Sequence, residues 1–538
     1  MTSALVPAQA RSLAVAQAGL YVASFMAVFD IAVVYLALPS IERSIGAGLA
    51  DQQWIASAYG LMEAGFTLAA GTLGDLYGRK RVYVVGVIIF IVGSIGSGLA
   101  PSPRILIASR FVQGIGGAIT LALPLGILVS MVEGQAAIER TIRTFATIAG
   151  LGAVTAPAVG GILVQALGWR SVFFVNVPIS LFVLYAAFVH TPESQPDRSR
   201  KLDLWGQITS ALALVSFSFA VIEGNAFGWH SRIIVAAALL AVLWAAAFAL
   251  IERRVSSPMI RFSLLVQPLF AAGVWTLFVI NGGFFTLYLI ASLFLQDVAR
   301  VSALGAGWFL LSNNVLFFLA NQFSEPVARR LGERGAALLG MGIASCGLLT
   351  FVGFHATTPA ALAMIPLGLC GLGWGLAFTP INDLAMSVVD KQDDGLASGM
   401  LSLGRPLGAV FGTAVFGSLL GAFMQSSLRE RLFELNAPPS VRDAIAAAIH
   451  HGGLWSVLQG SPHFGLPPHT LRDSIDGGFI GGMHVAGVVS GAVSLVAVAY
   501  AAYAYRSRTP VRTDRPQGRF RALWIRALAH RRDTRAGS

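Results

Sequence analysis

The segment that decides the fold is GTLGDLYGRKR, residues 71–81, which lies between two long apolar stretches at residues 53–74 and 82–100. A turn this short between two segments of spanning length predicts a pair of antiparallel membrane helices. Its glycines allow a sharp turn, and its carboxylate and cations can bond to neighbouring helices. We therefore expect it to hold helices in one of two arrangements. The expected latch residues are Gly71, Gly74, Asp75, Gly78 and Arg79.

The composition is typical of a polytopic membrane protein. Of the 538 residues, 55% are hydrophobic and 12% are charged, whereas a soluble chain is about 25% charged. The 59 glycines agree with this, because small residues let membrane helices approach closely. Both cysteines, Cys346 and Cys370, lie within apolar runs, so no disulfide framework is expected. The predicted fold class is all-α integral membrane.

Segments long enough to cross a bilayer contain about 20 mostly apolar residues. Fourteen such segments occur, at residues 17–39, 53–74, 82–100, 105–131, 142–167, 171–190, 204–224, 233–251, 265–290, 302–323, 335–354, 359–387, 396–424 and 477–505. The first is long enough to be a retained helix rather than a signal peptide. An even number of crossings places both termini on the same side.

Lys and Arg are divided unevenly between the two faces. The loops after even-numbered spans two to twelve hold 15 of them, and the six short loops on the other face hold five. Because cytoplasmic loops carry an excess of positive charge, we predict that the first set of loops and both termini are cytoplasmic. The protein is therefore expected in the inner (cytoplasmic) membrane.

A weaker copy of the opening segment, EPVARRLGERG, occupies residues 325–335 and also lies in a predicted cytoplasmic loop. Such a copy is typical of a transporter built from two related halves. The expected parts are a cytoplasmic N-terminus at 1–16, a six-helix bundle at 17–190, two inserted helices at 203–252, a second six-helix bundle at 265–505 and a tail at 506–538.

Two segments lie outside the predicted spans. The tail, residues 506–538, has ten Arg and two Asp. It either fixes the topology or docks on anionic lipid, and nucleic-acid binding is not expected because no recognisable module accompanies the charge. The predicted periplasmic loop, residues 425–476, includes a candidate short helix at 440–449. It also holds His450, His451, His463 and His469. Their spacing does not match a metal site, and no metal is expected.

Ionisable side chains inside the spans indicate a functional or structural role, because inserting each one into the membrane costs about 2.5–3.5 kcal/mol on insertion scales. They are Asp30, Glu63, Arg110, Asp383 and Arg405. A carboxylate at Asp30, in low dielectric, could exchange protons, attract a cationic substrate, or bond a neighbouring helix. Glu63 shares a helix face with the aromatic residue Tyr59, which suits a lipophilic cation, although pairing with a nearby Arg is an equal alternative.

Several motifs resemble one known family. The opening segment resembles the loop signature of the major facilitator superfamily, and RFVQGIGGA at 110–118 resembles its fourth-span signature. DIAVVYLALP at 30–39 and GWRSVFFVNVP at 168–178 are similar to segments of its fourteen-span drug:H⁺ antiporters. Ala32 and Tyr35 stand where that family usually has Thr and Asn.

The fifth span, GLGAVTAPAVGG at 150–161, is similar to the signature found in exporters of the superfamily. Small residues there predict a close helix crossing, and the proline frees a backbone carbonyl and permits a bend. The residues of this antiporter motif are Gly152, Pro157, Gly160 and Gly161.

The resemblance implies the major facilitator fold, with fourteen transmembrane helices, and proton-coupled export of drug-like or amphipathic molecules by alternating access. It implies that Asp30 and Arg110 couple protons to movement. Glu63, which has no counterpart in the family pattern, is added on its position alone. A substrate site is expected at mid-membrane between the halves. Its candidate residues are Phe25, Tyr59, Asn281, Tyr288, Asn313, Asn314, Phe378 and Asp383. Ordinary helix packing is the alternative for each aromatic or Asn.

Other functions remain to be separated. A solute importer or symporter of the same fold is opposed by the fifth-span signature, and a membrane receptor or scaffold would use the basic tail. No enzyme activity is expected, because no segment resembles a nucleotide-binding Walker loop, and no cofactor is expected. The expected partners are a small-molecule substrate, protons and membrane lipid. We expect a monomer, and a periplasmic adaptor is left open.

Overall fold

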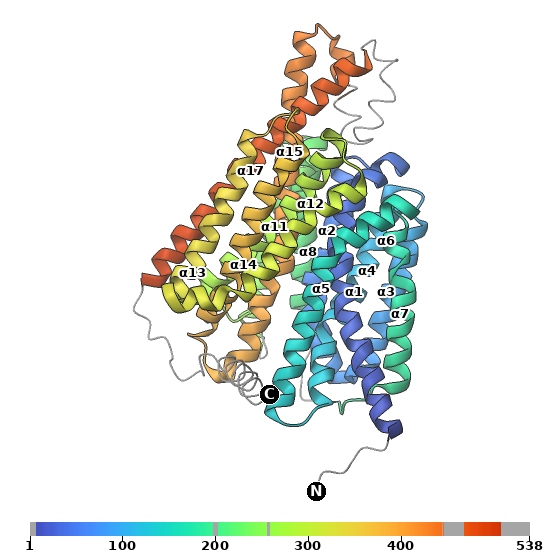
Figure 1. Cartoon of the computed structure of the whole chain (residues 1–538), viewed down its shortest axis with the longest axis vertical. Coiled ribbons are helices and arrows are strands. Elements are labelled where there is room, and N and C mark those ends of the chain that lie inside the picture. The colour runs from blue at the N-terminus through green and yellow to red at the C-terminus, as the bar shows by residue number, and fades with distance from the viewer. Residues whose placement is uncertain (1–6, 197–202, 256–258, 444, 446–466, 507–538) are drawn as a thin grey trace, which may run out of the picture.

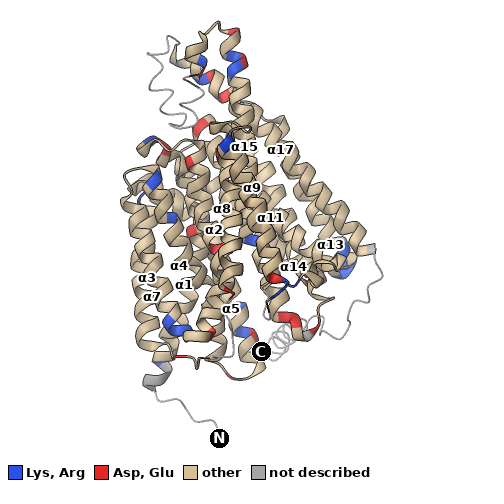
Figure 2. Cartoon of the chain, turned by 180° about the vertical axis from the view of Figure 1, so that it is seen from behind, with Lys and Arg blue, Asp and Glu red and all other residues tan. Residues whose placement is uncertain are grey.

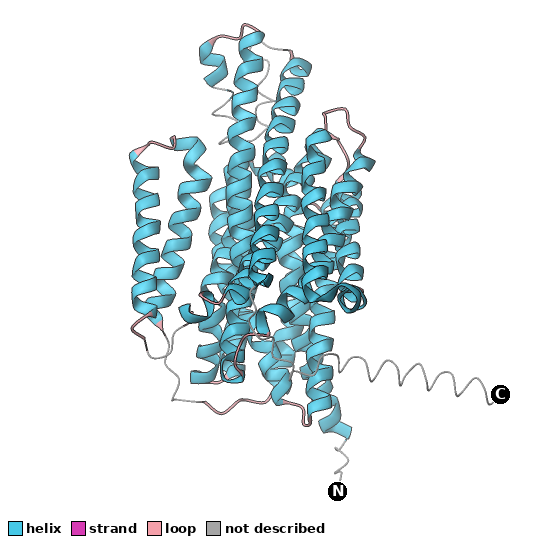
Figure 3. Cartoon of the chain, turned by 90° about the vertical axis from the view of Figure 1, so that its left-hand side faces the viewer, coloured by secondary structure: helices cyan, strands magenta, loops and turns pink. Residues whose placement is uncertain are grey.

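The computed structural model describes residues 7–196, 203–255, 259–443, 445 and 467–506. This described part is helical, with turns and short loops between the helices and no strand (Figure 3). The helix bounds are α1 Pro7–Ile45, α2 Leu49–Tyr77, α3 Arg79–Leu99, α4 Pro103–Ser130, α5 Gln135–Leu167, α6 Ser171–Phe174, α7 Asn176–Tyr185, η1 Ala186–His190, α8 Leu204–Phe227, α9 Arg232–Glu252, α10 Phe262–Leu265, α11 Pro268–Leu293, η2 Phe294–Val298, α12 Ala303–Gln322, α13 Ser324–Leu349, η3 Thr350–Gly353, η4 Ala360–Ala363, α14 Met364–Met386, η5 Lys391–Asp393, α15 Asp394–Glu434 and α17 Pro468–Arg506.

The long helices run between two ends of one bundle (Figure 1). We call the end at which α1 begins the lower end, and the end beyond which α15 and α17 project the upper end. Charged residues gather near these two ends, and few lie at mid-height (Figure 2). This distribution is expected where the middle of the bundle lies in hydrocarbon, because burying a charge there is costly.

Thirteen helical segments of the described chain are long and apolar enough to cross a membrane. The all-helical membrane class is therefore confirmed. The predicted span at 53–74 corresponds to α2, which is not among the thirteen. The reason is its surroundings: α2 packs against α4, α15 and α8, so its polar residues face protein rather than lipid. A helix covered on several sides does not need an apolar surface all round.

We call the helices α1 to η1 the N-half and the helices α10 to α17 the C-half, after their order in the chain. The halves meet where α5 packs on α12, where α2 packs on α15 and where α1 touches α11. The inserted helix α8 contacts both α2 and α15, and α9 packs on α8. Large apolar side chains of α9 remain exposed, as expected of a helix that faces lipid.

Several boundaries differ from the expected ones, because apolarity marks the membrane and not the helix end. Helix α1 begins at Pro7, earlier than the expected start at residue 17. Helices α15 and α17 continue beyond the bundle into the predicted 425–476 loop (Figure 1). Residues 439–443 are helical, at the start of the predicted short helix. The predicted tail, and His450, His451 and His463, lie outside the described residues except for Arg506, which ends α17.

Candidate functional site

Asp30 and Arg110 form an ion pair in the interior of the N-half, with exposures of 0% and 1%. Arg110 Nη1 donates to Asp30 Oδ2 at 2.7 Å. Gln113 Nε2 and Asn176 Nδ2 both donate to Asp30 Oδ1. Both carboxylate oxygens thus accept hydrogen bonds, which offsets the cost of removing the charge from water.

The rest of the Arg110 side chain is also bonded. Its Nε donates to the Ile55 carbonyl at 3.2 Å, and its guanidinium lies 4.6 Å from the centre of the Tyr59 ring. Gln113, which accepts a bond from Arg110, donates in turn to Ser94 Oγ at 3.0 Å. Helices α1, α2, α3, α4 and α7 all supply groups to this network, so every part of it belongs to the N-half.

Glu63 lies one turn from Tyr59 on α2 and is 7% exposed. The charged groups that act on it are Arg110 and Asp30 of the same half and Arg405 of the C-half. The Arg405 guanidinium lies 4.9 Å from the centre of the Phe378 ring. The structure therefore brings the predicted residues Glu63 and Tyr59 near Asp30 and Arg110, and places an arginine of the other half within electrostatic reach.

Other predicted substrate residues are engaged in helix contacts. Tyr288 Oη donates to Asn314 Oδ1 at 2.7 Å, and Asn313 Nδ2 donates to the Leu367 carbonyl at 2.8 Å. Asn281 Nδ2 bonds the Leu277 carbonyl of its own helix. The remaining predicted residues differ: Phe25 stacks on Phe29, with ring centres 5.9 Å apart, and Asp383 is exposed.

Helix α5 carries a broken backbone ladder at Pro157, which has no N–H for the Ala153 carbonyl four residues earlier. Asn314 Nδ2 of α12 donates to that carbonyl. A Cβ added at Gly161 would lie 2.9 Å from Leu304 Cα, and one added at Gly160 would lie 2.5 Å from Val33 Cγ2. The motif glycines thus allow α5 to touch α1 on one side and α12 on the other. A Cβ at Gly152 would likewise collide with the Phe25 carbonyl.

A second broken ladder lies in α1, where Pro39 leaves the Tyr35 carbonyl free. Ser292 Oγ of α11 donates to it at 2.8 Å, and Gln296 Nε2 donates to the Leu36 carbonyl at 3.0 Å. The Tyr35 hydroxyl also bonds Thr413 of α15 at 3.0 Å. These bonds join α1 of the N-half to α11, η2 and α15 of the C-half in the upper part of the bundle. The sequence analysis missed them, and Pro39 inside an apolar run was the available signal.

The opening segment, residues 71–81, is tied to its own half. Arg79 bonds Asp75 at 3.0 Å and donates to the Gly126 carbonyl at the lower end of α4. Glu193 Oε1, from the segment after η1, accepts from the Lys80 backbone. Gly78 has a φ of 98°, a conformation that side chains disfavour.

The remaining latch glycines differ in their surroundings. A Cβ at Gly74 would lie 2.7 Å from Leu123 Cδ2, whereas Gly71 has nothing within 4 Å. Close packing therefore explains why position 74 is a glycine, whereas nothing in this structure requires a glycine at position 71. The gating role of the segment stays a prediction.

Comparison with known proteins gives a consistent result. The family model described as the Major Facilitator Superfamily matches residues 20–413. The chain is 34% identical over 425 residues to the multidrug resistance protein Stp of Mycobacterium tuberculosis, covering 79% of each chain. It is 33% identical to the drug efflux pump JefA of the same organism, covering 79% of this chain and 83% of that one. It is 29% identical to the tetracenomycin C resistance and export protein of Streptomyces glaucescens, over 89% of both.

Solved structures share the fold. A bacterial homologue of the human lysosomal transporter Spinster, in an inward-facing and unoccupied conformation, superposes with a TM-score of 0.60 at 16% identity, covering 93% of this chain and 99% of that one. An auto-inhibited peptide transporter of the POT family superposes with a TM-score of 0.61 at 15% identity, covering 94% and 99%. At these identities the likeness shows the fold alone.

Proposed function

This chain belongs to the Major Facilitator Superfamily, and from that premise we propose that it exports drug-like or amphipathic small molecules by alternating access, driven by protons. Relatives at 33–34% identity are named as drug efflux or multidrug resistance proteins, which supports export. The observation that carries proton coupling is the buried Asp30–Arg110 pair. Because electrostatic interactions are stronger in a buried site, a proton on this carboxylate would change its interaction with Arg110 strongly.

In the proposed mechanism, the structure corresponds to the charged form of Asp30. A proton on either oxygen neutralises the group that holds Arg110, Gln113 and Asn176 together. Arg110 is then left without a counter-charge, so its contacts with α1 and α2 weaken. Because Arg110 also acts on Glu63, proton binding alters the charge that a cationic substrate would meet there.

We assign the lower end to the cytoplasm and the membrane to the inner (cytoplasmic) one, from the excess of Lys and Arg in the loops of that end. The upper end is then extracytoplasmic and closed by the bonds of Ser292 and Gln296 to α1. The crossing of α5 and α12 and the 71–81 segment would control access to the substrate site from the two sides of the membrane. The parts proposed are the N-half, the inserted pair, the C-half and the two termini.

The test is transport in proteoliposomes with an imposed pH gradient, using one cationic and one neutral dye. We expect gradient-dependent efflux of a dye by the wild type. Asp30→Asn should bind the dye within about threefold of the wild type but lose most gradient-driven transport, since the amide cannot carry the proton. Glu434→Gln, an exposed acid at the end of α15, is the matched control and should transport normally.

Two outcomes would contradict the proposal. Transport that ignores the gradient would reject proton antiport. Gradient-driven efflux by Asp30→Asn equal to that of Glu434→Gln would remove Asp30 as the proton carrier.

A further inference from the structure

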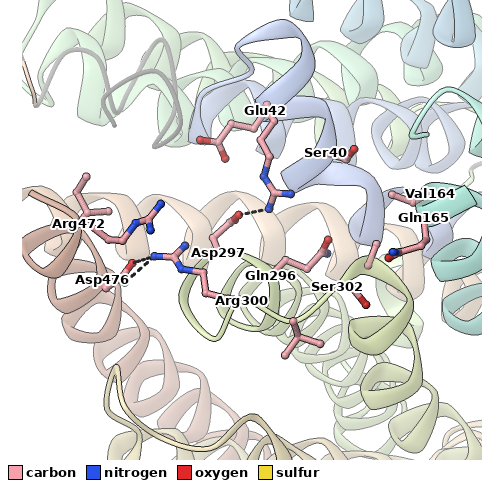
Figure 4. Close-up of a pocket in the computed structure, with 14 residues that line it drawn as sticks. Ser40, Glu42, Val164, Gln165, Gln296, Asp297, Arg300, Ser302, Arg472 and Asp476 are labelled. Carbon is pink, nitrogen blue, oxygen red and sulfur yellow. Dashed lines mark hydrogen bonds and ion pairs between the residues drawn. The ribbon is translucent and has the colours of Figure 1, made fainter. Parts of the chain in front are cut away.

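A cavity of about 500 Å³ lies at the upper end, between the two halves (Figure 4). Its walls come from the ends of α1 and α5, the connection from η2 to α12, and the first turns of α17. Its charged residues are Glu42, Arg43, Asp297, Arg300, Arg472 and Asp476. The cavity is separate from the Asp30 network, none of whose residues line it.

One ion pair in this cavity joins the halves. Arg43 Nη2, in the last turn of α1, donates to Asp297 Oδ1 of η2 at 2.9 Å. The Arg43 side chain is 41% exposed, so water reaches the pair, whereas the Asp297 side chain is 12% exposed. Asp297 directly follows Gln296, which together with Ser292 donates hydrogen bonds to backbone carbonyls of α1.

The two oxygens of Asp297 are in different situations. Oδ1 accepts from Arg43, while Oδ2 is buried and accepts no hydrogen bond from the described residues. A proton can therefore bind Oδ2 without displacing a donor. Once neutral, the carboxyl no longer attracts the Arg43 guanidinium as an ion, so this particular link between the halves is weakened.

The other charged groups around Asp297 have partners of their own. Arg300 donates to both oxygens of Asp476, at 3.1 and 2.8 Å, although it also acts on Asp297. Glu42, on α1, accepts from Gln52 at 3.0 Å.

The remaining walls add one more cation and neutral groups. Arg472, on α17, acts on Asp476. The α5 and α12 walls contribute the neutral groups Gln165 and Ser302. Arg43 is therefore the cation bonded to Asp297.

We propose that Asp297 is a second proton-binding site, which takes a proton from the extracytoplasmic solution and thereby releases the upper end. The proton moves from water to Oδ2, the Arg43 link is lost, and the halves separate at this end. The bonds to the Tyr35 and Leu36 carbonyls then become accessible to water, which can replace them. Extracytoplasmic access to the cavity rests on the orientation in the proposed function.

The test measures the distance between the halves at the upper end as the pH changes. Spin labels are placed at Leu167→Cys in α5 and Thr357→Cys in the connection after η3, both exposed. Cys346→Ser and Cys370→Ala remove the native thiols. We expect the ratio of long to short distances in lipid nanodiscs to rise up to about fivefold between about pH 8 and about pH 5, as the loss of one partly exposed ion pair allows.

The variants decide the assignment. Asp297→Asn and Arg43→Gln should show the long distance at both pH values and lose the response. Asp476→Asn removes an ion pair of the same cavity that lies within the C-half, and should respond like the wild type. Arg43→Lys keeps the charge and should also respond, which shows that the site folds with a substituted residue 43.

An unchanged pH response in Asp297→Asn, or a wild type without any response, would overturn the proposal. Asp30→Asn should keep the upper-end response, because its network lies within one half. A wild type that shows no gradient-driven transport, but whose upper-end distance still responds to pH through Asp297, would contradict the proposed function alone. The proposed function and the Asp297 proposal can therefore fail separately.

Discussion

The ion pairs Asp30–Arg110 and Asp297–Arg43 use the same two chemical groups and differ in what they connect. The first lies within the N-half, almost fully buried, and both carboxylate oxygens are bonded. The second joins the N-half to the C-half, is partly exposed, and leaves one carboxylate oxygen without a hydrogen bond from any described residue. A pair within one half moves with it as a body, whereas a pair between halves must break when they separate. Burial makes the first a determinant of stability, and position makes the second a determinant of conformation.

The largest effect on stability is expected from Arg110→Ala. It leaves the Asp30 charge buried without its counter-charge, which should lower the unfolding free energy by about 3–5 kcal/mol. Thermal unfolding in detergent measures the change. The double variant Asp30→Asn with Arg110→Gln should lose less than Arg110→Ala alone, because no charge is then stranded. Equal melting temperatures for Arg110→Ala and the wild type would show that the buried Asp30–Arg110 pair contributes no more to stability than the partly exposed Asp297–Arg43 pair.

An intermediate effect is expected from Asn314→Ala. It removes the side chain of the C-half that bonds the part-buried Ala153 carbonyl freed by Pro157. It also leaves the buried Tyr288 hydroxyl without its acceptor, at a cost of about 1–3 kcal/mol. Because the bond joins the halves, the loss should also raise the long-distance population at the upper end in the spin-label measurement. Asn281→Ala, which removes a bond within one helix, is the control and should leave that distance unchanged. A matching shift in both variants would argue against a special role for the inter-half bond.

The smallest effect on stability is expected from Arg43→Gln. An exposed ion pair contributes about 0–1 kcal/mol, so the melting temperature should stay close to that of the wild type. The same variant should nevertheless abolish the pH response of the upper end. A large loss of stability would place this pair in the same class as Asp30–Arg110 and remove the contrast between them.

Much of the site followed from local sequence features. Asp30 and Arg110 stood out because charges are rare in apolar runs, and the structure pairs them. Pro157 was predicted to free a carbonyl, and Ala153 is that carbonyl. Asn176 lay in a quoted motif, but its bond to Asp30 was not foreseen, because it depends on how α7 packs against α1.

The seam between the halves was the part least accessible from sequence. Tyr35 was noted only as a departure from a family pattern, and the structure shows it bonded to Thr413, 378 positions away. Asp297 and Arg43 were not selected, since both lie near span ends, where charges are ordinary. Nothing in the sequence around Arg43 or around Asp297 indicates that their side chains form an ion pair.

The sequence by itself determined the membrane class and most of the helical spans. These are local properties: a backbone in hydrocarbon must satisfy its own hydrogen bonds, so a long apolar segment becomes a helix whatever its neighbours are. Only the tertiary structure decided that the polar residues of α2 are covered by protein, and which ion pair stays within a half and which one joins the two. Those outcomes depend on packing between helices far apart in the chain, where a side chain's partner, rather than its own type, sets what it does.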